Sequence, residues 1–179
     1  MNLPNKLTIL RICMIPFFIA CFYLPFDFSV YIAAAVFAIA YATDALDGHL
    51  ARKNGQVTDF GKLMDPIADK LLSAAALIML TAMDMIHPVA VIVILSREFL
   101  ISGLRLVCAD KGVVVAASAW GKLKTISQVV CIMAVMAVYP LGIDWLKIAA
   151  DVTVWISVAL ALISGVDYLI KNRSCISTK

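Results

Sequence analysis

Six long apolar runs, separated by short polar breaks, dominate the chain and cover roughly residues 7–24, 29–50, 63–83, 87–107, 123–140 and 145–170. A helix needs about 20 mostly apolar residues to cross a bilayer, and each run approaches or exceeds that length. Of the 179 residues, 63% are hydrophobic and 15% are charged, whereas soluble domains average about 45–50% and about 25%. The sequence therefore predicts an all-α integral membrane protein with six transmembrane helices in a single domain, 1–179.

The same composition excludes several other classes of protein. A chain this apolar is neither intrinsically disordered nor a basic nucleic-acid-binding module nor an ordinary soluble enzyme. The net charge of +3 is too small to indicate a polyanionic partner. The five cysteines show no Cys-x-x-Cys spacing, and four lie in apolar runs. We interpret them as small buried hydrophobic residues rather than as disulfides or zinc ligands.

The basic residues lie almost entirely on one side of the predicted spans. An even number of spans places both termini on one side, and the Lys/Arg-rich side of a membrane protein is the cytoplasmic one. Only Lys147 falls on the other side. The remaining fourteen are Lys6, Arg11, Arg52, Lys53, Lys62, Lys70, Arg97, Arg105, Lys111, Lys122, Lys124, Lys171, Arg173 and Lys179. The asymmetry predicts cytoplasmic termini. Because Arg11 interrupts the first run, we interpret that run as a span rather than a cleaved signal peptide.

Four aspartates lie at or near the inner ends of the second and third runs. Asp44 and Asp47 are three residues apart and share a helix face, and Asp65 and Asp69 are four apart on another. Antiparallel neighbouring helices would bring the four carboxylates around one volume. Like charges that close do not all stay ionised unless cations lie between them. Divalent cations with oxygen ligands fit this pattern, and two carboxylate pairs indicate two ions.

Small residues accompany the aspartates. Gly48 and Ala51 extend the first acidic face, and Gly61 extends the second, so a large ligand could approach the backbone there. Arg52 offers a bidentate partner for a phosphate group. Helix packing is the simpler explanation for each glycine taken alone. Pro66 either begins the third helix or kinks it beside the aspartates.

The pattern Asp44-x-x-Asp47-Gly48-x-x-Ala51-Arg52, eight residues, then Gly61-x-x-x-Asp65-x-x-x-Asp69 resembles the signature of the CDP-alcohol phosphotransferase family. The six-span layout also fits that family. The resemblance implies a CDP-linked lipid as donor, release of CMP, and two divalent cations (Mg²⁺ or Mn²⁺) held by the four aspartates. It further implies Asp69 as the general base, a homodimer, and a bacterial cell membrane location with the active site facing the cytoplasm.

Further motifs bear on the acceptor. Arg97-Glu98-x(6)-Arg105, Gly121-Lys-Leu-Lys-Thr and Asn5-x-x-Thr8-x-x-Arg11 resemble bacterial family members that use glycerol 3-phosphate. The resemblance implies transfer of the phosphatidyl group from CDP-diacylglycerol to glycerol 3-phosphate, giving phosphatidylglycerophosphate and CMP. An arginine as deep in a span as Arg97 usually faces a cavity or a partner. The candidates for the acceptor phosphate are Arg97, Arg105, Lys122 and Lys124. Those for the CDP-lipid are Asn5, Thr8, Arg11, Gly48, Ala51, Arg52 and Gly61.

Three alternatives stay open at this point. Inositol phosphate, serine or phosphatidylglycerol could replace glycerol 3-phosphate as acceptor. A divalent-cation transporter would also place acidic residues on membrane helices, although its ligands would favour the midplane. A non-catalytic lipid-binding protein would leave the paired carboxylates unexplained.

Overall fold

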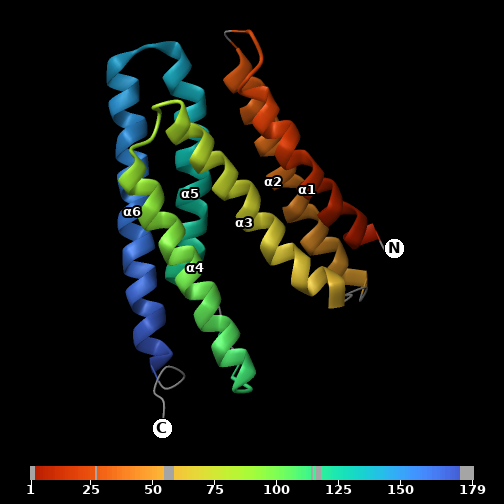
Figure 1. Ribbon diagram of the computed structural model, residues 1–179. Helices are drawn as coiled ribbons and strands as arrows, with labels where there is room; N and C mark the ends of the chain where they lie inside the picture. Colours follow the sequence, from red (N-terminus) through yellow and green to blue (C-terminus); the bar gives the residue numbers. More distant parts are fainter. Residues whose placement is uncertain (1–2, 27, 55–58, 114, 116–117, 174–179) are drawn as a thin grey trace.

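The computed structural model describes the backbone of residues 3–26, 28–54, 59–113, 115 and 118–173. For residues 3–8, 44–54, 59–66 and 69 it describes the helical backbone and not the side chains. The described residues form six α-helices and one short 3-10 helix, in the same order as the predicted spans (Figure 1). They are α1 (Leu3–Cys21), α2 (Ser29–Asn54), α3 (Asp59–Ala82), α4 (Pro88–Asp110), α5 (Ala119–Val138), η1 (Tyr139–Leu141) and α6 (Asp144–Lys171).

The helix ends agree with the polar breaks in the sequence. Each predicted edge lies within four residues of a helix end, because the apolar period that defines a span also continues the helix. Pro66 falls inside α3, which begins at Asp59, rather than in its first turn. Gly112 and Gly142 adopt left-handed backbone conformations, with φ of 72° and 70°, in the turns after α4 and η1. Glycine suits both turns because it carries no Cβ to clash there.

The helices form two groups, which are joined by contacts of α3 with α4 and α5 and of α2 with α5. On one side α1 packs against α2 and α3, and on the other α6 packs against both α4 and α5. Helix α3 also contacts α4 and α5, and Figure 1 shows it running between the two groups. The core contains buried aromatic residues of α1, of the turn that follows it, and of α2. The ring of Phe18 meets those of Phe22 and Phe37 at centroid distances of 5.2 and 6.1 Å.

Polar side chains cap the helices of the second group. His87 precedes α4, and its Nδ1 accepts a hydrogen bond from the backbone N–H of Val89 at 3.3 Å. Ser118 precedes α5, and its Oγ accepts from the N–H of Gly121 at 3.0 Å. These caps satisfy backbone donors that a helix leaves unpaired at its start. His87 thus has a structural role at a helix end.

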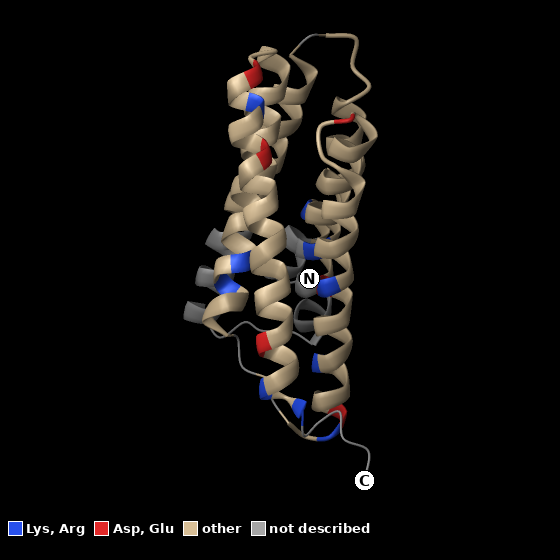
Figure 2. Cartoon of the chain, turned by 90° about the vertical axis from the view of Figure 1, so that its left-hand side faces the viewer, with Lys and Arg blue, Asp and Glu red and all other residues tan. Residues whose placement is uncertain are grey.

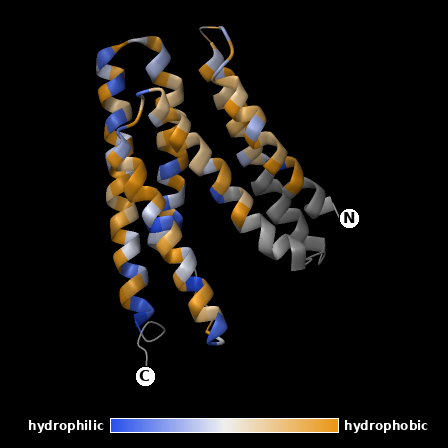
Figure 3. Cartoon of the chain, viewed as in Figure 1, coloured by the Kyte–Doolittle hydropathy of each residue, from blue (hydrophilic) through white to orange (hydrophobic). Residues whose placement is uncertain are grey.

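The outer surfaces of the helices are largely apolar. Figure 3 shows hydrophobic residues along most of α4, α5 and α6, with hydrophilic residues at the ends of the bundle and again near its mid-height. Within the described part of the chain, two segments are long and apolar enough to cross a membrane, Ala119–Leu141 and Asp144–Lys171. Shorter apolar stretches occur at Ile9–Cys21, Ser29–Thr43 and Lys70–Ala82. In α4 the apolar sequence is interrupted by Arg97, Glu98 and Arg105.

Two adjacent phenylalanines test the packing of α1. Phe18 is fully buried and Phe17 is 61% exposed. Phe18→Ala should lower the free energy of unfolding by roughly 3 kcal/mol, because it removes packed contacts and leaves a cavity. Phe17→Ala should have little effect. Thermal unfolding midpoints in detergent micelles measure both variants, and equal shifts would contradict this placement of α1.

Candidate active site

The two aspartate pairs lie at matching positions on α2 and α3. Asp44 and Asp47 precede the end of α2 by ten and seven residues, and Asp65 and Asp69 follow the start of α3 by six and ten. At about 1.5 Å per residue, each pair is roughly 9–15 Å from the connection between the two helices. The two helices also contact each other. The backbone therefore brings both pairs to one level, as the sequence predicts for neighbouring antiparallel helices.

The side chains of these four aspartates lie outside the described residues, and so do those of Asn5, Thr8, Ala51 and Arg52 and the surroundings of Gly48 and Gly61. Among the described side chains, no group of three or more His, Cys, Asp or Glu residues could hold a metal ion. Arg11, the remaining candidate for the CDP-lipid, is buried in α1 with 4% of its surface exposed. The metal and CDP-lipid sites therefore remain predictions.

A polar cluster lies between α4, α5 and α6, at the level where Figure 2 shows several Lys and Arg residues side by side. We call the residues Arg97, Glu98, Arg105, Lys124, Gln128, Ser164 and Tyr168 the cationic cluster. Its lysine, Lys124, is completely buried. The Nζ of Lys124 forms an ion pair with Glu98 Oε1 and donates a hydrogen bond to Gln128 Oε1. Both contacts are needed, because a buried ammonium without partners is very costly.

Arg97 is the second buried cation of this cluster. It is 9% exposed, and its Nη2 donates to Ser164 Oγ on α6. Its Nη1 lies 3.8 Å from Glu98 Oε1, the same carboxylate oxygen that Lys124 binds. The buried Nε of Arg97 has no hydrogen-bond partner among the described residues. Two buried cations therefore share one carboxylate, which leaves this part of the molecule with surplus positive charge.

Tyr168 of α6 connects the two arginines of α4. The guanidinium carbons of Arg97 and Arg105 lie 5.5 and 5.3 Å from the centroid of its ring. These distances are typical of cation–π contacts. Arg105 Nη2 also donates a hydrogen bond to the phenol oxygen at 2.6 Å, and the backbone N–H of Ser118 donates to the same oxygen at 3.1 Å. Tyr168 thus joins α4, α6 and the start of α5.

The local sequence explains why Arg97 points inward. The buried residues of α4 recur at three- or four-residue intervals, and Arg97 falls between Ile94 and Ile101 on that face. The facing surface of α6 carries small residues, which allow the two helices to come close. At Gly165, an added Cβ would lie 3.4 Å from Arg97 Cγ. The arginine stem therefore packs directly on the α6 backbone.

A lysine of α3 links the acidic helix to this cluster. Lys70 follows Asp69, and its Nζ donates to Ser102 Oγ on α4. Ser102 Oγ in turn donates to the backbone carbonyl of Glu98 at 2.6 Å. The side chain of Glu98 therefore binds α5, and Ser102, one turn further along α4, binds Lys70 of α3. This chain of contacts positions the aspartate helix relative to the cationic cluster.

Three of the four residues predicted for an acceptor phosphate meet in this cluster. Arg97 and Arg105 meet at Tyr168, and Lys124 meets Arg97 at Glu98. Lys122 instead lies exposed in the first turns of α5.

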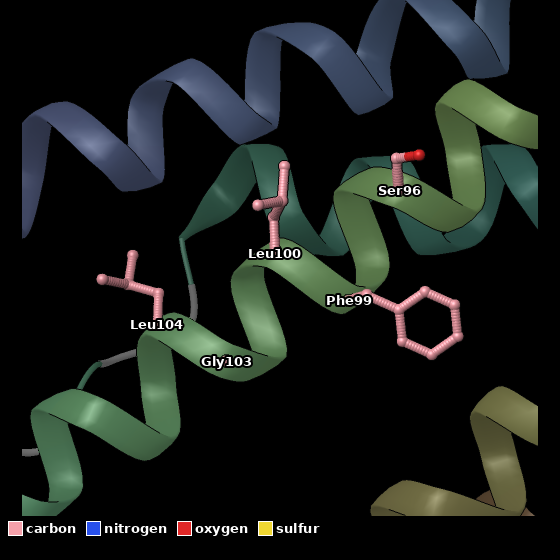
Figure 4. Close-up of a pocket in the computed structure, with 5 residues that line it drawn as sticks. All are labelled: Ser96, Phe99, Leu100, Gly103 and Leu104. Carbon is pink, nitrogen blue, oxygen red and sulfur yellow. The ribbon is translucent and has the colours of Figure 1, made fainter.

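An open hollow occurs on a different face of α4, where Figure 4 shows Ser96, Phe99, Leu100, Gly103 and Leu104. That hollow is mostly apolar and includes none of the predicted site residues.

Sequence reasoning did not anticipate several partners in this cluster. It assigned no role to Tyr168, Gln128 or Ser164, and it used Lys70 only as a marker of sidedness. One signal was available: Ser157, Ser164 and Tyr168 are polar residues spaced seven and four apart in a mostly apolar helix. That spacing puts them on one helix face. The face itself does not reveal which helix it contacts.

Comparison with known proteins identifies the family. The chain belongs to the CDP-alcohol phosphatidyltransferase family, whose profile matches residues 1–163. This confirms the family resemblance of the aspartate signature and favours a transferase over a cation transporter.

Similar proteins from bacteria cover nearly the whole chain. The CDP-diacylglycerol–glycerol-3-phosphate 3-phosphatidyltransferase of Bacillus subtilis is 42% identical over an alignment of 190 positions, gaps included. The alignment covers 99% of this chain and 98% of that protein. Proteins of the same name from Rickettsia felis and Haemophilus influenzae are 41% and 39% identical over 168 and 172 residues. They cover 93% and 94% of this chain, and 93% and 91% of their own lengths.

The buried ion pair yields a stability prediction. Glu98→Gln should lower the free energy of unfolding by about 3–5 kcal/mol, because it leaves the Lys124 ammonium buried without its carboxylate. The double variant Glu98→Gln/Lys124→Met should recover most of that loss. Thermal unfolding in detergent compares them with Lys124→Met alone and with Asp144→Asn, which removes an ion pair to Lys147 whose carboxylate is 94% exposed. The Asp144→Asn control should shift stability by less than about 1 kcal/mol. A double variant as unstable as the sum of its parts would contradict the pairing.

Proposed function

We propose that the protein transfers the phosphatidyl group of CDP-diacylglycerol to glycerol 3-phosphate, releasing CMP and phosphatidylglycerophosphate. The observation that carries this assignment is the match, over nearly the full chain, to bacterial proteins named for this reaction. The surplus positive charge around Arg97 and Arg105 supports an acceptor that carries its own phosphate. Arginine suits that task because its planar donors bind phosphate oxygens in pairs.

The proposal includes a membrane arrangement. All six α-helices would cross a bacterial cell membrane as one domain, with both termini and the active site in or facing the cytoplasm. The distribution of charge supports this orientation. Figure 2 shows most of the described Lys and Arg between mid-height and the end of the bundle where the chain terminates. Lys147, in the first turns of α6, lies toward the other end. The family resemblance also implies a homodimer, which we include in the proposal.

Divalent cations would complete the donor side of the site. Asp44, Asp47, Asp65 and Asp69 would hold two Mg²⁺ or Mn²⁺ ions, since carboxylate oxygens are the ligands these ions prefer. The matching level of the two pairs on α2 and α3 fits such a donor set. When bound, the ions neutralise charge on the pyrophosphate of the donor.

The residues of the chain would carry the transfer itself. Asp69 accepts the proton of the attacking hydroxyl of glycerol 3-phosphate. The hydroxyl oxygen forms a bond to the lipid-side phosphorus, and the bond from that phosphorus to the oxygen of CMP breaks. CMP leaves with the electron pair. Arg97 and Arg105 hold the acceptor phosphate, and the buried Lys124 contributes positive charge beside Glu98. Lys122, exposed one turn into α5, would attract the anionic acceptor from outside the cluster.

The remaining predicted residues would bind the donor. Asn5, Thr8, Arg11 and Arg52 are polar groups for the CDP end, and the small residues Gly48, Ala51 and Gly61 would let it approach the helices.

Lys70 joins the two halves of the site, because it follows Asp69 and bonds to Ser102 beside the cationic cluster. An acceptor held at Arg97 would therefore lie in a fixed relation to the base.

Removal of the proposed base tests the reaction. Purified protein with Mg²⁺ or Mn²⁺ should release CMP from CDP-diacylglycerol only when glycerol 3-phosphate is present, and chelation with EDTA should stop it. Asp69→Asn should reduce kcat by at least about 10²-fold, the lower range for loss of a general base. Asp110→Asn, at the exposed end of α4, is the matched control and should retain activity. Near-normal turnover by Asp69→Asn would exclude Asp69 as the base.

Replacement of the buried arginine tests the acceptor. Arg97→Gln should raise the KM for glycerol 3-phosphate about tenfold or more, because it removes a charge-assisted contact, and leave the KM for CDP-diacylglycerol unchanged. Arg97→Lys keeps the charge and should give a smaller increase. Arg173→Gln, exposed just beyond α6, is the control.

A panel of alternative acceptors, inositol phosphate, serine and phosphatidylglycerol, identifies the preferred acceptor. Preference for an uncharged alcohol would overturn the assignment.

A further inference from the structure

We propose that Tyr168 is a positioning residue that holds Arg97 and Arg105 together to bind the acceptor's phosphate, an inference that rests on the proposed function. Arg97 and Arg105 are eight residues apart on α4, which separates their backbones by about 12 Å along the helix. Tyr168 nevertheless has both guanidinium carbons within 5.5 Å of its ring centroid. One aromatic side chain on another helix thus brings two distant cations to a common point.

The ring counteracts the repulsion between the two arginines. Two guanidinium groups repel each other, and an electron-rich ring face attracts both. The hydrogen bond of 2.6 Å from Arg105 Nη2 to the phenol oxygen fixes the orientation of one of them. Arg97 is oriented by its bond to Ser164. The pair is therefore arranged before any ligand arrives, which lowers the entropy cost of binding.

Tyr168 can direct the arginines because it is itself fixed. Its side chain is buried, with 2% exposure, and its phenol oxygen accepts the backbone N–H of Ser118 at 3.1 Å. It also packs against the backbone of α5 at Gly121. A Cβ added there would lie 3.1 Å from Tyr168 Cε2 and 3.2 Å from its oxygen. The first turn of α5 thus sets the position of the ring.

The two arginines keep donors for a ligand. Arg105 is exposed to solvent apart from its contact with Tyr168. Arg97 Nε has no hydrogen-bond partner among the described residues. Glu98 does not neutralise Arg97 fully, because its carboxylate binds Lys124 more closely. A phosphate dianion is the chemical group that two such guanidinium groups bind best.

Loss of the phenol oxygen is the direct test. Tyr168→Phe keeps the ring and removes the acceptor for Arg105 and Ser118. The KM for glycerol 3-phosphate should rise about tenfold, the effect of losing one charge-assisted hydrogen bond. The kcat and the KM for CDP-diacylglycerol should stay within about twofold. Tyr139→Phe is the matched control, because it removes the same group from a bond to Asp151, 2.8 Å long, at the other end of α5.

A second test displaces the Tyr168 ring without altering the tyrosine itself. Gly121→Ala should also raise the KM for glycerol 3-phosphate, since its Cβ would push the Tyr168 phenol away. Alanine is the better helix former, so a weakened helix would not explain that loss. Gly103→Ala is the control, because a Cβ on Gly103 would meet no atom within 4 Å. It should leave the KM unchanged.

The possible outcomes separate this proposal from the function on which it rests. If Tyr168→Phe raises the KM no more than Tyr139→Phe does, or lowers kcat while both KM values stay the same, the positioning role is wrong. If the unmodified protein releases no CMP with glycerol 3-phosphate, the proposed function fails. In that case a binding measurement tests the positioning role. It compares how much glycerol 3-phosphate raises the thermal unfolding midpoint of the unmodified protein and of Tyr168→Phe. A smaller rise in Tyr168→Phe supports it, and an equal rise, or none in the unmodified protein, overturns it.

Discussion

The ion pair between Lys124 and Glu98 is the interaction on which the second half of the molecule depends. Lys124 is fully buried among apolar helices, where an unpaired ammonium would be too costly to keep. Its carboxylate partner Glu98 on α4 therefore has to stay within contact distance, which ties α4 to α5 although both helices pack mainly against α6. Because Glu98 binds Lys124, Arg97 is left with incomplete neutralisation. The positive charge that suits a phosphate-bearing acceptor is thus a consequence of the same pair that holds the helices together.

The chain separates two chemical tasks between two groups of helices. The acidic signature lies on α2 and α3, and the cationic cluster lies between α4, α5 and α6. The proposed transfer between two phosphate-bearing substrates would use both, with metal ions held by the first and the acceptor phosphate by the second. Lys70 connects them through Ser102. The helix that carries the aspartates is therefore held against the helix that carries the arginines, and the relative position of donor and acceptor is built into the packing.

Much of this could be predicted from the sequence, and the rest has a common physical reason for being missed. The helix ends follow from apolar runs and turn residues, which are local properties. Which of the two lysines near the start of α5 binds Glu98 depends on contacts between helices and not on the local sequence. Lys122 and Lys124 are two residues apart and point to different sides of the helix, so only one of them could reach Glu98. Tyr168 was missed because its partners are 63 residues or more away on α4.

By itself the sequence determined the family, the order of the described helices, and the position of two aspartate pairs at matching levels of α2 and α3. These properties depend on helix geometry and hydrophobic period, which act over a few residues. Only the tertiary structure decided that Lys124 pairs with Glu98, that Arg97 is held by Ser164, and that one tyrosine joins two arginines. Such contacts depend on which helix faces meet and how closely. Small residues such as Gly121 and Gly165 set that approach, and no short stretch of sequence specifies it.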